Sequence, residues 1–253
     1  MKLTLERAEE ILKKHTTEEH LFTHALAVSS AMGAMAEHFG EDPEYWRAIG
    51  YLHDVDYEKF PEEHCKHVRE LLAPEGVDEE DIRAIISHGY GLCTEEVKPE
   101  TNLEKSLFAV DELTGIVMAC ALMRPTGITD LEVSSLKKKF KDKKFAAKCN
   151  REIIKQGAET LDMPLEELME LTIKGMKTEA DAGPGRKGIE KSIKKAGIFP
   201  LFYLRGKARY AIIHLRMLLN GGELMDDSCS CTGKQASAEG VHLCRFMART
   251  RGI

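Results

Sequence analysis

Apolar residues recur at three- and four-residue spacing along most of this chain, from about residue 5 to residue 181. That period places them on one face of an α-helix, whereas a half-buried strand would alternate apolar and polar residues. No convincing alternating segment interrupts the pattern, and runs of β-branched residues are few. The sequence therefore predicts an all-α fold, and 253 residues with 43% hydrophobic content are enough to bury a substantial core.

Capping signals divide this pattern into separate helices. Asp42 followed by Pro43 is typical of a helix start, and Gly40 is typical of the end of the helix before it. Capping boxes, in which a threonine precedes a glutamate by three residues, are predicted at Thr16 and Glu19, Thr101 and Glu104, and Thr129 and Glu132. The expected helices cover residues 5–14, 16–39, 43–54, a segment that starts at Pro61, 78–88, 101–123, a lysine-rich segment after Glu132, 145–160 and 164–176.

Charge changes sign near Gly183, in a Gly-Pro-Gly sequence that is also the strongest turn signal. Residues 183–253 contain 13 lysines and arginines against 5 acidic residues, although the whole chain carries a net charge of −6. We predict one domain over residues 1–182 and a basic extension over residues 183–253 that is partly disordered. Such an extension suits contact with a membrane surface, nucleic acid or a protein partner.

The start of the chain lacks the apolar run of a signal peptide, and we find no stretch approaching the roughly 20 apolar residues of a membrane span. We therefore expect a cytoplasmic protein whose cysteines are free thiols.

Histidines and aspartates lie at the apolar faces or ends of the predicted helices. His53 shares a helix face with Trp46 and Ile49, and Asp54 follows it directly, so an imidazole and a carboxylate meet at the edge of the core. The same helical phase places His24 and His64 near buried faces, with His67 further off, and the order of residues puts His88 at a helix end beside the core.

Asp111 is the sharpest anomaly, because it falls within the apolar arc of its helix while Glu112 points to solvent. A buried carboxylate is costly unless a cation or a hydrogen-bond donor meets it. Either a salt bridge to a basic residue such as Arg124 or a metal ion would satisfy Asp111.

In chain order the set reads His24, His53-Asp54, His64, His88 and Asp111. This order resembles the HD superfamily of metal-dependent phosphohydrolases, whose motif is a histidine, a His-Asp pair and a distant aspartate, with further histidines inserted in members that bind two metals. The resemblance covers about residues 16–125 and implies an HD-domain helical bundle with additional C-terminal helices and a poorly defined basic tail. The family's common His-Asp-Ile-Gly-Lys reads His-Asp-Val-Asp-Tyr here. A lysine is thus missing, and Lys59 is its expected substitute.

The resemblance implies a metal site made from these residues. One ion would be held by His24, His53, Asp54 and Asp111, and a second by His64, His88 and the bridging Asp54. We expect one or two divalent transition metals among manganese, iron, zinc, cobalt and nickel, with magnesium acceptable at one site. A water between the ions would attack phosphorus, and Asp56, Glu58 or a metal-bound water would protonate the leaving group. Phosphate contacts are expected from Lys59, Arg124, Lys138 and Lys139, although a lysine run equally fits a solvated face.

These features predict a hydrolase that cleaves a phosphomonoester, phosphodiester or phosphoanhydride bond of a small substrate, with nucleotides as the favoured class. Two other functions fit the same residues. A dinuclear iron oxygenase would need iron and oxygen, and a non-catalytic nucleotide sensor would bind its ligand without turnover.

Overall fold

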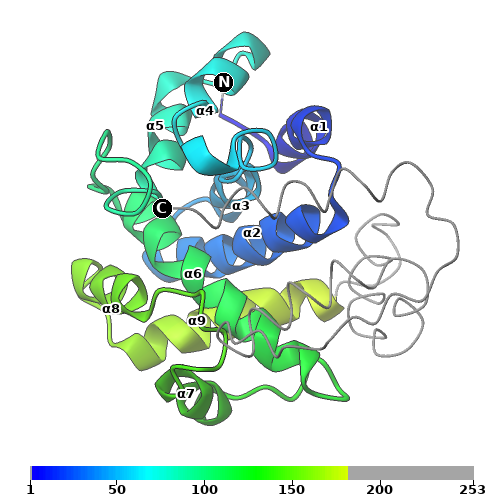
Figure 1. The fold of residues 1–253 in the computed structure, drawn as a ribbon, viewed down its shortest axis with the longest axis vertical. Helices are drawn as coiled ribbons and strands as arrows, with labels where there is room; N and C mark the ends of the chain where they lie inside the picture. The colour runs from blue at the N-terminus through cyan, green and yellow to red at the C-terminus, as the bar shows by residue number, and fades with distance from the viewer. Residues whose placement is uncertain (1, 182–253) are drawn as a thin grey trace, which may run out of the picture. The chain divides into compact units, whose positions relative to one another are not determined.

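The computed structural model describes residues 2–181. It contains α1 (Leu5–His15), α2 (Glu19–Phe39), α3 (Pro43–Leu52), α4 (Val68–Leu72), α5 (Glu79–Ser87), α6 (Asn102–Leu122), α7 (Val133–Lys141), α8 (Arg151–Thr160) and α9 (Leu165–Asp181), with short 3-10 helices at Pro61–Glu63 and Ala73–Glu75 (Figure 1). This part of the chain has no strand beyond an isolated bridge between Tyr90 and Thr94. The prediction of an all-α fold is confirmed, whereas the predicted basic extension lies outside the described residues.

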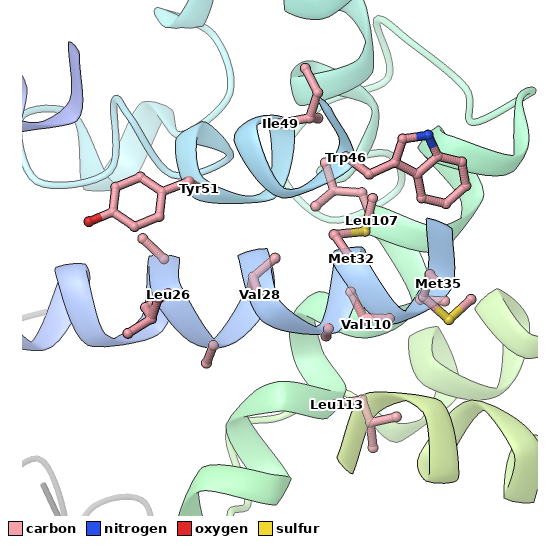
Figure 2. Close-up of a cluster of buried hydrophobic side chains, with 14 of the residues drawn as sticks. Leu26, Val28, Met32, Met35, Trp46, Ile49, Tyr51, Leu107, Val110 and Leu113 are labelled. Carbon is pink, nitrogen blue, oxygen red and sulfur yellow. The ribbon is translucent and has the colours of Figure 1, made fainter. Parts of the chain in front are cut away.

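Helix α2 lies at the centre of the described bundle. It packs against α3, α6 and α9, and every residue from Ala25 to Ala36 is buried. A helix that is surrounded in this way must be apolar or small on all its faces. Figure 2 shows Met32 of α2 beside Leu107 of α6. Small residues let α9 approach α2 closely, because a Cβ at Gly175 of α9 would overlap the carbonyl oxygen of Ser30 in α2.

The predicted helix starts are only partly correct. Asp42 caps α3 through the backbone N–H groups of Glu44 and Tyr45, and Thr101 and Glu104 form the predicted capping box of α6. The box at Thr129 is wrong, because α7 begins at Val133 and Glu132 occupies the cap position without a side-chain cap bond.

The box at Thr16 is also wrong, because a distant carboxylate caps α2 instead. Glu58 accepts hydrogen bonds from the N–H groups of Thr17 at 2.8 Å and Glu18 at 3.0 Å. The start of α2 is thereby attached to the segment that follows His53 and Asp54.

Two predicted helices are shorter than expected. The segment from Pro61 is not one helix, because the backbone leaves helical geometry at His64 and takes a left-handed conformation at Cys65, with φ of 69°. Residues 142–150 are turns, and Arg151 at the start of α8 donates to the carbonyl oxygens of Ala146 at 2.7 Å and Cys149 at 2.8 Å. In both segments, side-chain hydrogen bonds to the backbone replace the expected helical ones.

Among the described residues, the helices are too short or too polar to cross a lipid bilayer.

Candidate metal centre

Three of the predicted residues meet where α2, α3 and α6 converge. His24 lies within α2, His53 is the residue that ends α3, and Asp111 lies in the middle of α6. His24 Nε2 is 3.1 Å from His53 Nε2 and 3.0 Å from Asp111 Oδ1, and His53 Nε2 is 3.4 Å from the same oxygen. Three ligand atoms from three helices therefore surround one point.

A second pair of imidazoles, those of His64 and His88, faces the Oδ1 atom of the Asp54 carboxylate. The Nε2 atoms of His64 and His88 are 3.1 Å apart, and Asp54 Oδ1 lies 3.2 Å from His64 and 3.6 Å from His88. Asp54 Oδ2 lies 3.3 Å from His53 and 3.5 Å from His24. The Asp54 carboxylate thus stands between the two groups, with one oxygen toward each.

The tautomers of His64 and His88 leave lone pairs that face one another, because His64 Nδ1–H donates to Asp56 Oδ1 at 2.8 Å while its Nε2 lies 3.1 Å from that of His88. His53 Nδ1–H donates to the carbonyl oxygen of Gly50 at 2.9 Å, and His88 Nδ1–H donates to that of Ile85 at 2.6 Å. A carbonyl oxygen only accepts, so in a neutral ring the Nε2 atom carries a lone pair and no hydrogen. Acceptor atoms at 3.1 Å repel unless a proton or a metal ion lies between them. The residues present therefore fit a divalent metal, because nitrogen and carboxylate oxygen are the donors that such ions take.

Protonation balances the same charges when no metal is bound. Burial lowers the pKa of His53, but the carboxylates of Asp54 and Asp111 outweigh burial and raise this pKa well above its usual value. Burial likewise acts against the charge on His64, yet its hydrogen bonds to Asp54 and Asp56 raise its pKa to about 10. Burial raises the pKa of Asp54, but the facing imidazoles bring it well below its usual value, and His24 and His53 do the same for Asp111.

Exposure is uneven across the centre. The side chains of His53 and His88 are 0% and 2% exposed, whereas those of His24, Asp111 and Asp54 are 24%, 19% and 16% exposed. The most buried members of the centre are thus His53 and His88, and its more exposed members are His24, Asp111 and Asp54.

Asp56, a candidate general acid, is buried beside His64. Its side chain is fully buried, Oδ1 accepts a hydrogen bond from His64 Nδ1 at 2.8 Å, and Oδ2 accepts from the N–H of His67 at 3.3 Å. Both oxygens are engaged on the far side of the His64 ring from the other ligands. Through these hydrogen bonds Asp56 holds the ring of His64 in one orientation and favours one tautomer. Glu58, the other candidate acid, is bound to the start of α2.

The four residues expected to contact phosphate are not gathered at the centre. Arg124 binds Asp130 at 2.7 Å, and α6 advances by roughly 16 Å between Asp111 and its last residue, Leu122. Of the two alternatives for Asp111, the salt bridge to Arg124 is thus not formed, and His24 and His53 face this carboxylate instead.

The remaining lysines are engaged or directed elsewhere. Lys59 donates to His15 Nδ1 at 2.9 Å. Lys138 is exposed on α7, and Lys139 lies 4.8 Å from the ring centre of Phe145. In Figure 1, α7 is at the lower edge, away from α4 and α5.

Three neighbours of the centre escaped the sequence reasoning. The ring centre of Tyr57 lies 5.2 Å from that of His64, and the tyrosine is 41% exposed. Cys65, which directly follows His64, lies within contact of His88 and Cys93. Glu112 is also misassigned, since it accepts from the N–H of Asn150 at 3.0 Å and is partly buried rather than directed to solvent.

Comparison with known proteins agrees with this arrangement. A family model described as the HD domain matches residues 21–116, a range that contains all six converging side chains. Searches of the curated proteins and of the solved structures found no match. HD domains are helical, bind divalent metals and belong to a family of metal-dependent hydrolases. Through residues 21–116, this chain therefore carries an HD domain.

Proposed function

We propose that this protein is a phosphohydrolase that uses one or two divalent metals to cleave a phosphate ester or anhydride bond of a small substrate, with nucleotides as the favoured class. The observation that carries the proposal is the convergence of four imidazole Nε2 atoms on both oxygens of Asp54, with Asp111 beside the first pair. This donor set suits two adjacent ions that share a carboxylate.

The protein's own residues would divide the work. His24, His53, Asp54 and Asp111 would hold one ion, and His64 and His88 would hold a second, bridged by Asp54. Bound ions of this kind activate water and neutralise phosphate oxygens. Asp56 would keep His64 in position through its 2.8 Å hydrogen bond.

Tyr57 is our candidate for the contact with substrate that the lysines do not supply. Its side chain is exposed beside His64. Burial of the phenol and the nearby Asp54 charge raise its pKa above the usual value, so it keeps its proton at neutral pH and acts as a hydrogen-bond donor.

The test combines metal analysis of the purified protein with phosphate release from phosphomonoesters, cyclic nucleotides and dinucleoside polyphosphates. We expect turnover that a chelator abolishes and that Asp54→Ala eliminates while the fold is retained. His67→Ala is the matched control, because this histidine stacks on Phe60, contacts Glu63 and Glu70, and should be nearly silent.

Metal-loaded protein that is inert across the whole panel would contradict the proposal. Oxygen uptake by iron-loaded protein would assign the centre to an oxygenase. Tight nucleotide binding without turnover would assign it to a sensor.

A further inference from the structure

Two cysteines form a sulfur pair beside His64 and His88, the second group of histidines at the centre. Cys65 Sγ and Cys93 Sγ are 3.2 Å apart, although 28 positions separate them in the chain. Cys65 is fully buried, whereas Cys93 is partly exposed. A disulfide has its sulfurs at about 2.0 Å, so bond formation requires an approach of only about 1.2 Å. One sulfur of the pair is open to a small reagent, and the other is held directly behind it.

The backbone around Gly89 holds this pair together. A Cβ at Gly89 would lie 2.5 Å from Cys65 Sγ and would overlap Cys93 Sγ as well. The Gly89 carbonyl oxygen also accepts hydrogen bonds from the N–H groups of Leu92, Cys93 and Thr94, at 3.0, 3.0 and 3.2 Å. Only glycine leaves room for both sulfurs over this turn, and the turn fixes Cys93 against Cys65.

The same pair is joined directly to the histidines. Cys65 follows His64 in sequence, Gly89 follows His88, and Cys65 Sγ lies 3.8 Å from His88 Nε2. A displacement of the Cys65 sulfur therefore acts on the residue that follows His64. A displacement of the Cys93 sulfur acts on Gly89, against which it packs and which follows His88.

We propose that Cys65 and Cys93 are an oxidation site, which a peroxide converts to a disulfide and a thiol reductant restores. The Cys93 sulfur attacks one peroxide oxygen, the O–O bond breaks, and Cys93 becomes a sulfenic acid with release of one water. The Cys65 sulfur then displaces the hydroxyl group from Cys93, which leaves as a second water with the Cys65 proton. In sum, two thiols and one hydrogen peroxide give one disulfide and two waters, so the thiols lose two electrons and the peroxide gains them.

Closing the disulfide also weakens the second metal position. This consequence rests on the proposed function, because it treats His64 and His88 as ligands. Groups that support metal ligands typically change affinity about 10–100-fold when they are disturbed. We therefore expect the oxidised protein to bind Mn²⁺ about tenfold more weakly at this position.

Peptide mapping tests the disulfide directly. Reduced, metal-free protein is treated with equimolar hydrogen peroxide, alkylated and digested with trypsin, which releases residues 60–66 and 84–105 as the peptides that carry Cys65 and Cys93. We expect these two peptides to be linked in the wild type and in the control Cys120→Ser, and separate after reduction. The link should be absent in Cys65→Ser and Cys93→Ser.

The folded state supplies a second readout that does not depend on variants. The linked peptides should form at least about tenfold faster in folded protein than in protein unfolded in urea, because the fold holds the sulfurs together. Equal rates in the two states would overturn the proposal. Linkage of Cys93 to a cysteine other than Cys65, or its conversion to a sulfinic acid without any link, would overturn it as well.

Calorimetric titration with Mn²⁺ after removal of peroxide tests the consequence for the metal centre. We expect weaker binding in the oxidised wild type and unchanged binding in peroxide-treated Cys93→Ser. A disulfide with unchanged Mn²⁺ affinity would refute the link to the centre. Failure of the proposed function has a different signature, since the protein would then release no phosphate even when it is reduced and loaded with metal.

Discussion

Replacement of Asp56 by asparagine separates a positioning role from a general acid. An asparagine has one oxygen, so it can accept from His64 or from the N–H of His67, and its NH₂ group then faces the other donor. A buried donor left without a partner costs about 1–3 kcal/mol of unfolding free energy. The loosened His64 should cost about 10–100-fold in metal affinity, which equals about 1.4–2.7 kcal/mol.

The assay compares wild type, Asp56→Asn and the control His67→Ala by Mn²⁺ calorimetry, by urea unfolding and by phosphate release at increasing Mn²⁺. We expect Asp56→Asn to bind one Mn²⁺ more weakly and to recover most of its turnover when Mn²⁺ is in excess. His67→Ala keeps its backbone N–H to Asp56 and should match the wild type. The reasoning is refuted if Asp56→Asn binds Mn²⁺ normally yet loses roughly 10²–10⁴-fold of its turnover at saturating metal, which is the effect of removing a general acid.

Three further predictions concern pH and packing. The His64 pKa of about 10 exceeds its unfolded value, so the proton stabilises the metal-free fold below pH 6.5 and is lost as the pH rises toward 10. Because Mn²⁺ must displace this proton, its affinity measured by calorimetry should rise up to about tenfold per pH unit between pH 7 and 9. In His64→Ala, Mn²⁺ displaces one proton fewer, so the affinity should depend less steeply on pH. Glu58→Ala should cost about 1 kcal/mol at pH 7 in urea unfolding. Burial acts to raise the Glu58 pKa, but its hydrogen bonds lower this pKa below the usual 4.5. The difference in stability between the wild type and Glu58→Ala should therefore vanish as the pH falls through the lowered pKa and Glu58 gains a proton. Gly175→Ala should cost about 1–3 kcal/mol in thermal unfolding, because its Cβ meets α2 backbone, and more than Gly33→Ala, which meets only the flexible Arg47 side chain.

Much of the fold could be predicted because local signals and burial agree along the long helices. In α6 the capping box at Thr101 and the apolar positions from Leu107 to Val117 indicate the same element. The errors fall where a distant residue replaces a local cap. Glu58 caps α2 from 40 positions away, and no rule based on neighbouring residues detects such a contact.

The histidines of the centre could be named from the sequence, but the reason for one of them was wrong. The phase of a continuous helix predicts that His64 faces the core, but the structure has no helix at that residue. It faces the other ligands because Asp56 holds its Nδ1 and because Cys65 adopts a left-handed backbone. Arg124 and the lysines of α7 are predicted from their charge, and charge does not reveal that Arg124 follows the end of α6, three turns of helix beyond Asp111.

These differences divide the centre into two halves of unequal construction. The first group stands on α2, α3 and α6, whose mutual packing forms the core, so its geometry follows from the burial of large apolar surfaces. The second group stands on the end of α5 and on the irregular segment around His64, which depends on the hydrogen bonds of one buried aspartate and on the turn at Gly89. Hydrogen bonds of this kind contribute about 1 kcal/mol each, far less than a packed core. We therefore expect the proposed second metal position to be the half of the centre that a single substitution at Asp56, a proton on His64 or a bond between Cys65 and Cys93 changes while the helical bundle stays intact.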